Sequence, residues 1–293
     1  GLKAGWVMFA ENPVGVIGLG IIIFFGLFAL AHPILMNTVW SNKVYDPLMG
    51  YDMEVEAHPS PPSLRHILGT DATGRDVLSQ LMYSTRYEFA LGILSAVITV
   101  VIATTIGALA AYYGGLVDTL LMRLADLVIM VPFLPILIVL SAVSKNGIGM
   151  VELAVVIGVV SGFGSTTVVV KSQALAVKVK PYIEAARIAG GGDLHIIFKH
   201  MVPNLMPIAL LYMMFVVTTA IFSEAVLSFF GLTTIQMSWG LMINHTQFHG
   251  YLRSFEHWYL LFPASLSITF LCAAFYLVGR ALDEVVNPRL RNR

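Results

Sequence analysis

The segment KVKPYIEAARIAGGGDLHIIFKHMVPN, residues Lys178 to Asn204, is the most polar and most punctuated part of the second half of a very apolar chain. Long hydrophobic stretches lie on both sides of it, so we expect it to be a loop between two membrane spans. Its own pattern predicts two short helices joined by a turn.

The first predicted helix begins at Pro181, because the missing N–H of proline would be unpaired at that position anyway. Glu184 lies in the first turn, where a negative charge favours the positive helix end, and Ala185 and Ala186 are good helix formers. Gly190 opens a run of three glycines, which predicts a helix end and a tight turn since glycine readily adopts positive φ.

The second predicted helix is capped by Asp193 and ended by Pro203. Four residues between them have the spacing of one apolar helix face: Leu194, Ile197, Phe198 and Met201. An apolar face outside the bilayer needs a cover. The pattern alone leaves open whether the rest of the chain or a partner protein supplies it.

The segment resembles the EAA loop of ABC importer permeases, the cytoplasmic element that docks into an ATP-binding subunit. The ending at His200, Pro203 and Asn204 is similar to the dipeptide, oligopeptide and nickel branch of that family. The resemblance implies that the following residues couple the chain to the ATPase: Glu184, Ala185, Ala186, Gly190, Asp193, Phe198, His200 and Pro203.

Composition agrees with a membrane protein. The chain has 293 residues, of which 57% are hydrophobic and 12% charged, whereas a soluble domain has about 25% charged residues. The formal net charge is zero, so the chain lacks the basic character of a nucleic-acid-binding domain. The single cysteine, Cys272, cannot form a disulfide within the chain.

Hydropathy predicts an all-α polytopic membrane protein with six transmembrane helices, at about 14–36, 87–113, 119–143, 151–176, 205–230 and 260–280. Residues 1–86 hold the first span and an extracytoplasmic segment with an amphipathic helix. Residues 87–280 form a permease core of five spans with the loop at 178–204, and residues 281–293 form a cytoplasmic tail. Pro132 and Pro135 are expected to bend the third span.

Small residues repeat along the second and fourth spans and predict close helix packing, as at Gly92, Gly107 and the Gly158/Gly162 pair. Three charged residues flank the start of the third span. Arg123 is expected to pair with Asp118 or with Asp126, which anchors that helix at the membrane edge.

A second motif precedes the second span and has the outline of a P-loop, with Gly69 and Gly74 at the right spacing. Arg75 and Asp76 follow where a P-loop has Lys and Ser or Thr. An aspartate at the magnesium-binding position would repel a nucleotide, so ATP binding is excluded. The segment is instead similar to the GTDxxGRDVLSR element of peptide-type permeases, through Gly69, Thr70, Asp71, Gly74, Arg75 and Asp76, which we place at the outer membrane surface.

Two other sets of residues are candidates for a site. Glu224 is a carboxylate deep in the fifth span, and we interpret it as a structural group hydrogen-bonded to neighbouring helices rather than as a substrate ligand. His245 and His249 are four residues apart, as zinc ligands can be. The HExxH general base is missing, so we expect no metal site there.

Charge asymmetry sets the orientation. Eleven of the 17 Lys and Arg residues lie on the side of the EAA-like loop, and four of the other six lie in the long first loop. The positive-inside rule therefore predicts that this loop and both termini are cytoplasmic.

From Pro61 to Arg291 the chain resembles the C-type permease subunit of peptide-class ABC importers, with the type I importer fold. The resemblance implies a prokaryotic plasma membrane location. It also implies a second homologous permease, two ATP-binding subunits and an extracytoplasmic solute-binding protein as partners, with ATP and magnesium bound by the partner subunits and no cofactor in this chain. The alternative is an ion-gradient-driven secondary transporter or channel. No residue separates dipeptides, oligopeptides, nickel chelates and oligosaccharides as solutes.

Overall fold

The computed structural model of the protein describes residues 2–144, 147–253 and 255–286. The described chain is mostly helical, with two isolated bridges as its only β pairing. Its elements are α1 (Leu2–Ala10), α2 (Pro13–Thr38), α3 (Asn42–Tyr45), α4 (Val77–Tyr113), α5 (Gly115–Met130), α6 (Phe133–Val143), α7 (Met150–Phe163), α8 (Ser165–Lys178), α9 (Pro181–Ile188), α10 (Asp193–His195), the π-helical η1 (Ile196–Met201), α11 (Val202–Phe229), α12 (Trp239–Phe248), the short 3₁₀ turns η2 (Tyr251–Arg253) and η3 (Phe255–His257), and α13 (Trp258–Val286).

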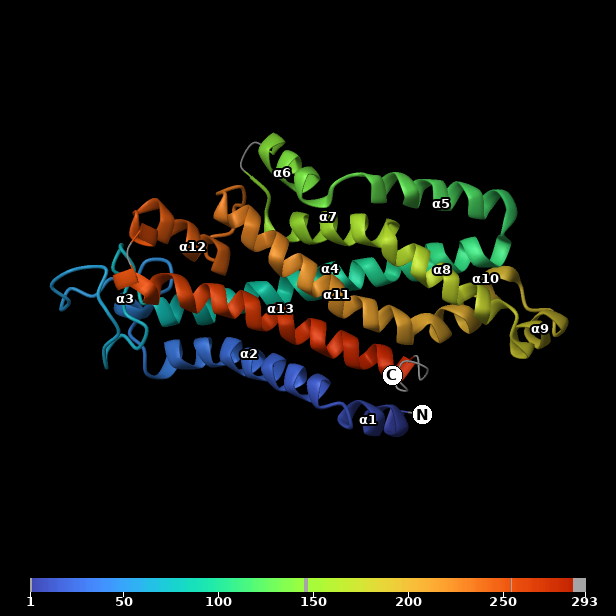
Figure 1. Ribbon diagram of the computed structural model, residues 1–293, viewed down its shortest axis with the longest axis horizontal. Helices are drawn as coiled ribbons and strands as arrows, with labels where there is room; N and C mark the ends of the chain where they lie inside the picture. Colours follow the sequence, from blue (N-terminus) through green and yellow to red (C-terminus); the bar gives the residue numbers. More distant parts are fainter. Residues whose placement is uncertain (1, 145–146, 254, 287–293) are drawn as a thin grey trace.

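Six membrane spans account for most of these helices. Four unbroken stretches are long and apolar enough to cross a bilayer: α2, α4, α10 through α11, and α13 with the η3 turn before it. Two bent pairs supply the other two spans, α5 with α6 and α7 with α8. The long helices run roughly side by side along the long axis of the molecule (Figure 1). The predicted six-span, all-helical architecture is therefore confirmed.

The helix α4 lies at the centre of the bundle and packs against α2, α7, α8 and α11. Glycines allow the close approach that the small-residue pattern predicted. A Cβ on Gly158 of α7 would lie 2.6 Å from Ile98, and one on Gly92 would lie 2.7 Å from Val217 of α11. The contact with α7 also includes a hydrogen bond from the Thr99 hydroxyl to the Gly158 carbonyl, 3.2 Å.

The third and fourth spans both break near their middle. The third bends by 80° between α5 and α6, at the predicted Pro132. The fourth also bends, by 43° where α7 and α8 meet at Gly164, a break that the sequence pattern did not indicate. The peptide at Gly164 has φ −83° and ψ −135°, which is not helical.

Three helix boundaries differ from the expected ones. No separate amphipathic helix precedes the second span, because α4 runs without interruption from Val77 through residue 87. Pro203 does not end the preceding helix: it lies in the first turn of α11, directly after η1, where its missing N–H costs little. The last span extends through Val286, so residues 281–286 of the predicted tail are helical, while residues 287–293 lie outside the described part.

The predicted pairing of Asp118 with Arg123 does not occur. Asp118 instead pairs with Lys171 of α8 at 2.5 Å, and the alternative predicted pair, Arg123 with Asp126, is present at 3.9 Å. The first contact joins the start of α5 to a different span, a connection that local spacing could not reveal. It fixes the end of the third span against α8.

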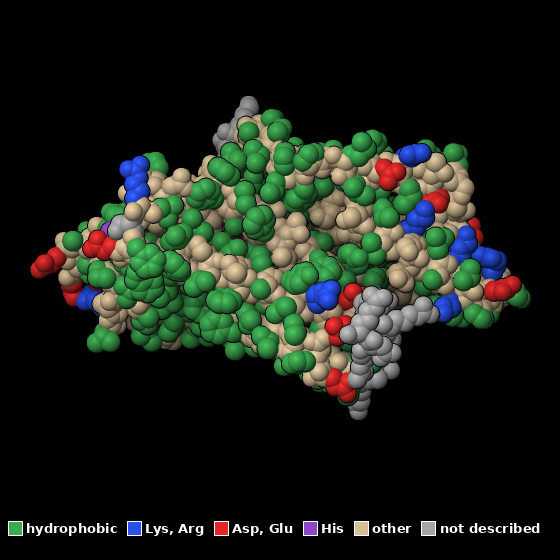
Figure 2. Space-filling model, in the orientation of Figure 1, with side chains coloured by type: hydrophobic (Ala, Val, Ile, Leu, Met, Phe, Trp, Pro, Cys, Tyr) green, Lys and Arg blue, Asp and Glu red, His purple; other side chains and the backbone are tan. Residues whose placement is uncertain are grey.

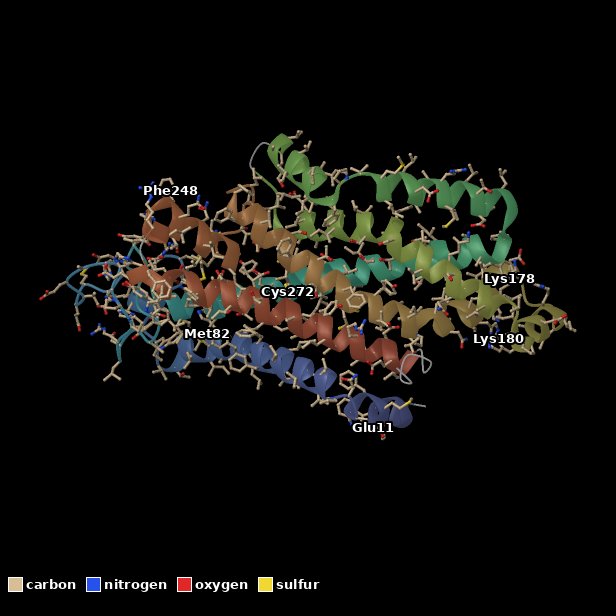
Figure 3. The ribbon with its side chains drawn as sticks, viewed as in Figure 1. Glu11, Met82, Lys178, Lys180, Phe248 and Cys272 are labelled. Atoms are coloured by element: carbon tan, nitrogen blue, oxygen red, sulfur yellow. The ribbon has the colours of Figure 1, made fainter. Side chains whose placement is uncertain are left out.

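Charged side chains gather mainly toward the two ends of the long axis, with hydrophobic side chains along the middle (Figure 2). Lys178 and Lys180 lie at the end that carries α9, Phe248 lies at the opposite end, and Cys272 lies midway on α13 (Figure 3). Helix α1 and the last turns of α13 lie toward the α9 end (Figure 1). This pattern suits a protein whose middle faces a bilayer.

Candidate functional site: the loop between α8 and α11 and the outer motif

The turn after α9 has a defined geometry that depends on two glycines. Gly190 has φ +84°, a conformation that favours glycine. The Gly190 N–H donates to the Arg187 carbonyl and the Gly191 N–H donates to the Ala186 carbonyl, both at 3.0 Å. These two bonds are those of a Schellman motif. A Cβ on Gly191 would lie 2.8 Å from the Ala186 carbonyl oxygen, so the second glycine is required by close approach.

One side of this segment is anchored in the protein. Ile183 of α9 and three residues of η1 are buried in a cluster with α4 and α8, the η1 residues being Ile196, Ile197 and Met201. The Tyr112 hydroxyl of α4 donates to Asp193 at 2.7 Å, and the Lys178 ammonium donates to the Ala111 carbonyl at 3.0 Å. The segment is therefore fixed to the ends of α4 and α8.

Asp193 was predicted to cap the second helix, and the structure shows a different role. Gly192 occupies the cap position and Asp193 is the first helical residue, without a side-chain capping bond. Its carboxylate accepts the bond from Tyr112 instead. The Asp193 side chain thus joins two separate elements.

The predicted single apolar face is divided between the interior and the surface. Ile197 and Met201 point inward and are fully buried, whereas Leu194 and Phe198 are 60% and 48% exposed. Ile188 at the end of α9 is 82% exposed. These three exposed residues, Ile188, Leu194 and Phe198, form what we call the loop patch. It presents apolar surface at the end of the molecule that carries α9.

Charged groups accompany the loop patch. A shallow hollow of about 300 Å³ beside α9 is lined by Lys178, Lys180, Glu184 and Arg187. Glu184, Ala185 and Pro203 are exposed, and the His200 carbonyl accepts a bond from the Asn204 amide at 2.7 Å. The predicted coupling residues thus lie in one segment, of which only part faces outward.

The segment from Gly69 to Asp76, which we call the outer motif, lies at the opposite end of the molecule. Several of its hydrogen bonds end on the Asp71 carboxylate. Asp71 Oδ1 accepts bonds from the backbone N–H groups of Thr73 and Arg75, at 2.8 and 3.0 Å. Its Oδ2 accepts from Arg75 Nε and from Gln80, at 2.8 and 3.0 Å. Burial opposes ionisation, but the Arg75 charge and these hydrogen bonds hold the pKa of Asp71 below its ordinary value. The backbone N–H groups of Thr73 and Arg75 are thus engaged by Asp71.

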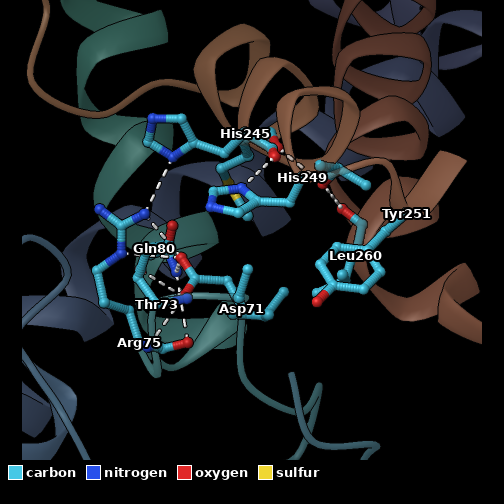
Figure 4. Close-up of a pocket in the computed structure, with 12 residues that line it drawn as sticks. Asp71, Thr73, Arg75, Gln80, His245, His249, Tyr251 and Leu260 are labelled. Atoms are coloured by element: carbon cyan, nitrogen blue, oxygen red, sulfur yellow. Dashed lines mark hydrogen bonds and ion pairs between the residues drawn. The ribbon is translucent and has the colours of Figure 1, made fainter. Parts of the chain in front are cut away.

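The outer motif also contacts α12. Arg75 Nη2 donates to His245 Nδ1 at 3.0 Å, and the two sides enclose a cavity of about 20 Å³, room for about one water (Figure 4). Burial and the nearby Arg75 charge lower the pKa of His245. His249 Nδ1 lies 2.8 Å from the His245 carbonyl oxygen. Both histidines are therefore engaged by protein groups rather than converging on one point.

A buried histidine that the sequence did not single out ties this region to α4. His66 Nδ1 lies 2.8 Å from Asp76 and its Nε2 lies 3.0 Å from Asp52. Asp76 is the N-cap of α4 and accepts from the Ser79 N–H at 2.7 Å. The hydrogen bond to Asp76, opposed by burial and aided by Asp52, raises the pKa of His66. A protonated His66 thus bridges the long first loop and the start of α4.

A pair of buried carboxyl groups lies inside the bundle. Glu88 of α4 and Glu224 of α11 are each 1% exposed, and their side chains interact with one another. The Ser228 hydroxyl donates to Glu224 at 2.5 Å. Glu88 was missed because the second span was predicted to begin at Tyr87, which placed it at the membrane edge. Since α4 begins at Val77, Glu88 lies three turns inside that helix.

Comparison with known proteins gives consistent matches. Residues 103–292 match the family described as "Binding-protein-dependent transport system inner membrane component". The chain is 30% identical to the dipeptide transport system permease protein DppC of Bacillus subtilis, over 98% of this chain and 85% of the relative. It is 31% identical to the oligopeptide permease OppC of the same organism, over 99% and 90%. The glutathione permease GsiD of Pectobacterium atrosepticum is 31% identical over 91% and 86%.

Proposed function

The chain belongs to the family of binding-protein-dependent transport system inner membrane components, and from this premise we propose that it forms half of the pathway of an ATP-driven importer for a peptide-like solute. The permease role is that of its relatives, whose names specify dipeptides, oligopeptides and glutathione. The remaining half of the pathway belongs to a second homologous permease in this proposal.

The observation that carries the proposal is the loop patch together with its anchor. Three apolar side chains, Ile188, Leu194 and Phe198, are exposed in the segment that also carries Lys178, Lys180 and Arg187. Exposed apolar groups rimmed by charges are typical of a protein interface. We assign this patch to the groove of an ATP-binding subunit, and each importer would contain two such subunits.

The anchor explains how force would pass from the ATPase to the membrane. Helix η1 continues directly into α11, and Tyr112 and Lys178 tie the segment to α4 and α8. A displacement of the loop patch therefore moves the ends of three spans together. ATP and magnesium would be bound by the partner subunits, while this chain converts their closure into a change of access.

The orientation follows from the same assignment. The basic loop end would be cytoplasmic, with both termini on that side, and the outer motif with α12 would face the solute-binding protein. The location would be the prokaryotic plasma membrane. The outer motif is then a structural brace, since Asp71 and Arg75 are engaged with one another and with α12.

Charge substitution in the loop patch tests the docking role. Leu194→Asp should weaken copurification of the ATP-binding subunits and lower ATP-driven peptide uptake in reconstituted vesicles. Phe248→Asp is the matched control, because Phe248 is 83% exposed at the opposite end. Equal binding of the ATP-binding subunits by both variants would reject the assignment.

An ion-gradient-driven transporter is the second candidate, and the buried pair of Glu88 and Glu224 favours it, since intramembrane carboxyl groups occur in proton relays. The two mechanisms differ in energy source. Uptake that needs ATP inside the vesicles and persists with a protonophore supports the importer. Uptake that stops with the protonophore and proceeds without ATP supports the alternative.

A further inference from the structure

A hollow of about 390 Å³ lies where the third and fourth spans break. Its walls come from the junction of α5 and α6 near Val131, the junction of α7 and α8 near Gly164, and the facing side of α11. We call it the midspan hollow. The volume falls within the range of about 300–1,000 Å³ typical of small-molecule sites.

Both breaks lie near the middle of their spans. Gly164 has fourteen helical residues on each side in α7 and α8, or roughly 21 Å in each direction. The break between α5 and α6 has sixteen helical residues on the α5 side and eleven on the α6 side. The hollow therefore lies at the depth of the bilayer centre.

Irregular backbone at this depth needs protein or water around it. The end of a helix leaves carbonyl groups without partners in the helix, and Pro132 cannot donate to the turn before it. Val131 at the break is 44% exposed. Non-helical backbone does not face lipid and is found only where it is buried in protein or lines a water-filled cavity. The exposed break is therefore either covered by another protein or lined by water.

The lining of the hollow combines apolar side chains with several hydroxyl groups and no charge among its described residues. Five hydroxyl-bearing residues line it: Ser161, Ser165, Thr166, Tyr212 and Thr219. Among the described residues of the lining, none is Asp, Glu, Lys, Arg or His. Phe133 and Phe215 add aromatic surface. The Thr219 hydroxyl donates to the Phe215 carbonyl at 3.0 Å, which leaves its oxygen able to accept a further bond.

We propose that the midspan hollow is this chain's part of the solute pathway, that it is filled with water, and that it binds the neutral amide groups of a peptide-like solute. The inference rests on the proposed function for the existence of a solute pathway. Hydroxyl groups bind backbone amides without selecting side chains, and an uncharged lining neither traps nor repels charged residues. Such a site suits a solute whose amide backbone is constant and whose side chains vary.

Thiol accessibility in the complete transporter tests the water-filled hollow. In a Cys272→Ser parent, we would introduce Thr219→Cys or Ser165→Cys and measure modification by a charged methanethiosulfonate reagent in reconstituted vesicles. The control is Leu27→Cys in the middle of α2, where Leu27 is 62% exposed on a different helix. Modification at positions 219 and 165 should be faster than at position 27 by on the order of 100-fold, the factor for a charged group at the bilayer centre. Equal rates at all three positions would overturn the proposal.

The solute class is tested in the same vesicles. A mixture of random-sequence tripeptides, with the solute-binding protein and ATP present, should slow modification at positions 219 and 165 but not at position 27. Maltose at the same concentration should have no effect. A failure of the peptides to protect would overturn the assignment of the ligand.

Peptide uptake by the Cys272→Ser parent distinguishes a failure of the inference from a failure of the proposed function. If the Cys272→Ser parent takes up peptides with ATP and the hollow positions are unreactive, the inference is wrong while the proposed function stands. If the parent shows no ATP-dependent uptake although the complex assembles, the proposed function is wrong, and the inference falls with it.

Discussion

Replacement of Gly190 by alanine tests whether the turn after α9 must keep its shape. Gly190 has φ +84°, yet a Cβ at this position would meet nothing within 4 Å. The cost of the substitution is therefore conformational rather than steric. Gly192 is the matched control, because it also has open space for a Cβ but has φ −69°.

The expected magnitude follows from the backbone. A non-glycine residue in the left-handed region costs roughly 1–2 kcal/mol, which is a factor of about 5–30 in an equilibrium. If docking requires the native turn, Gly190→Ala should weaken binding of the ATP-binding subunits by up to about that factor, since only the correctly folded fraction binds. Gly192→Ala should bind as the parent does.

The assay is titration of purified permease complex in nanodiscs with its ATP-binding subunits, followed by ATP-driven uptake. Membrane insertion and helix content should be unchanged in both variants, because the turn lies outside the spans. Identical affinities for Gly190→Ala and Gly192→Ala would refute the reasoning, since the two variants differ only in the required φ. The more severe Gly190→Val and the charge reversal Glu184→Lys should lower uptake further without loss of insertion.

Three further outcomes can be measured on single variants. His66 is protonated between two carboxylates, and its pKa is raised. The stabilisation from this contact is complete below the ordinary value of about 6.5 and is lost as pH rises through the folded-state value. Thermal unfolding of His66→Gln should lack this pH dependence, and identical pH profiles of the variant and the parent would contradict it. The buried carboxyl groups of Glu88 and Glu224 have no Lys or Arg ion pair in the described structure, and two facing charges there would repel. Glu88→Gln should therefore change the unfolding temperature by only a few degrees. A large loss of stability would show that an ionised Glu88 is required. Tyr112→Phe removes the hydrogen bond to Asp193, which is worth about 1 kcal/mol at this partly exposed site. The variant should lower ATP-driven uptake more than it lowers binding of the ATP-binding subunits. Equal losses of uptake and of binding would argue against a role of Tyr112 in transmitting the movement.

The six spans could be predicted from the sequence because each carries a long apolar stretch, and the glycines of the helix contacts follow from their spacing. The start of α4 could not be predicted in this way. The polar residue Arg86 lies just before the predicted start at residue 87, but the helix begins at Val77, and Glu88 interacts with the Glu224 carboxyl group of α11, 136 residues away in the chain. Pairing between distant segments decides such boundaries.

The loop segment was predicted in outline and corrected in detail. Spacing alone gave one apolar face from Leu194 to Met201, but half of that face packs against α4 and α8. Pro203 was read as a helix end, although a π-helical turn directly before it leads into α11. Widened turns of this kind accommodate proline in membrane helices, and no local pattern distinguishes them from a true end.

Long-range contacts account for the remaining differences. Asp118 finds Lys171 rather than its neighbour Arg123, and Arg75 finds His245 on α12. Each partner lies more than fifty residues away in the sequence. The break at Gly164 could not be predicted either, because a glycine in an apolar stretch is compatible with both a straight and a bent span.

The most direct test of the central claim is crosslinking from the loop patch in the assembled transporter. A photoreactive amino acid in place of Leu194 should crosslink to an ATP-binding subunit, whereas the same group in place of Phe248, at the opposite end of the molecule, should not. Crosslinks to the ATP-binding subunit from position 248, or none from position 194, would contradict the assignment of Lys178 to Asn204 as the docking segment.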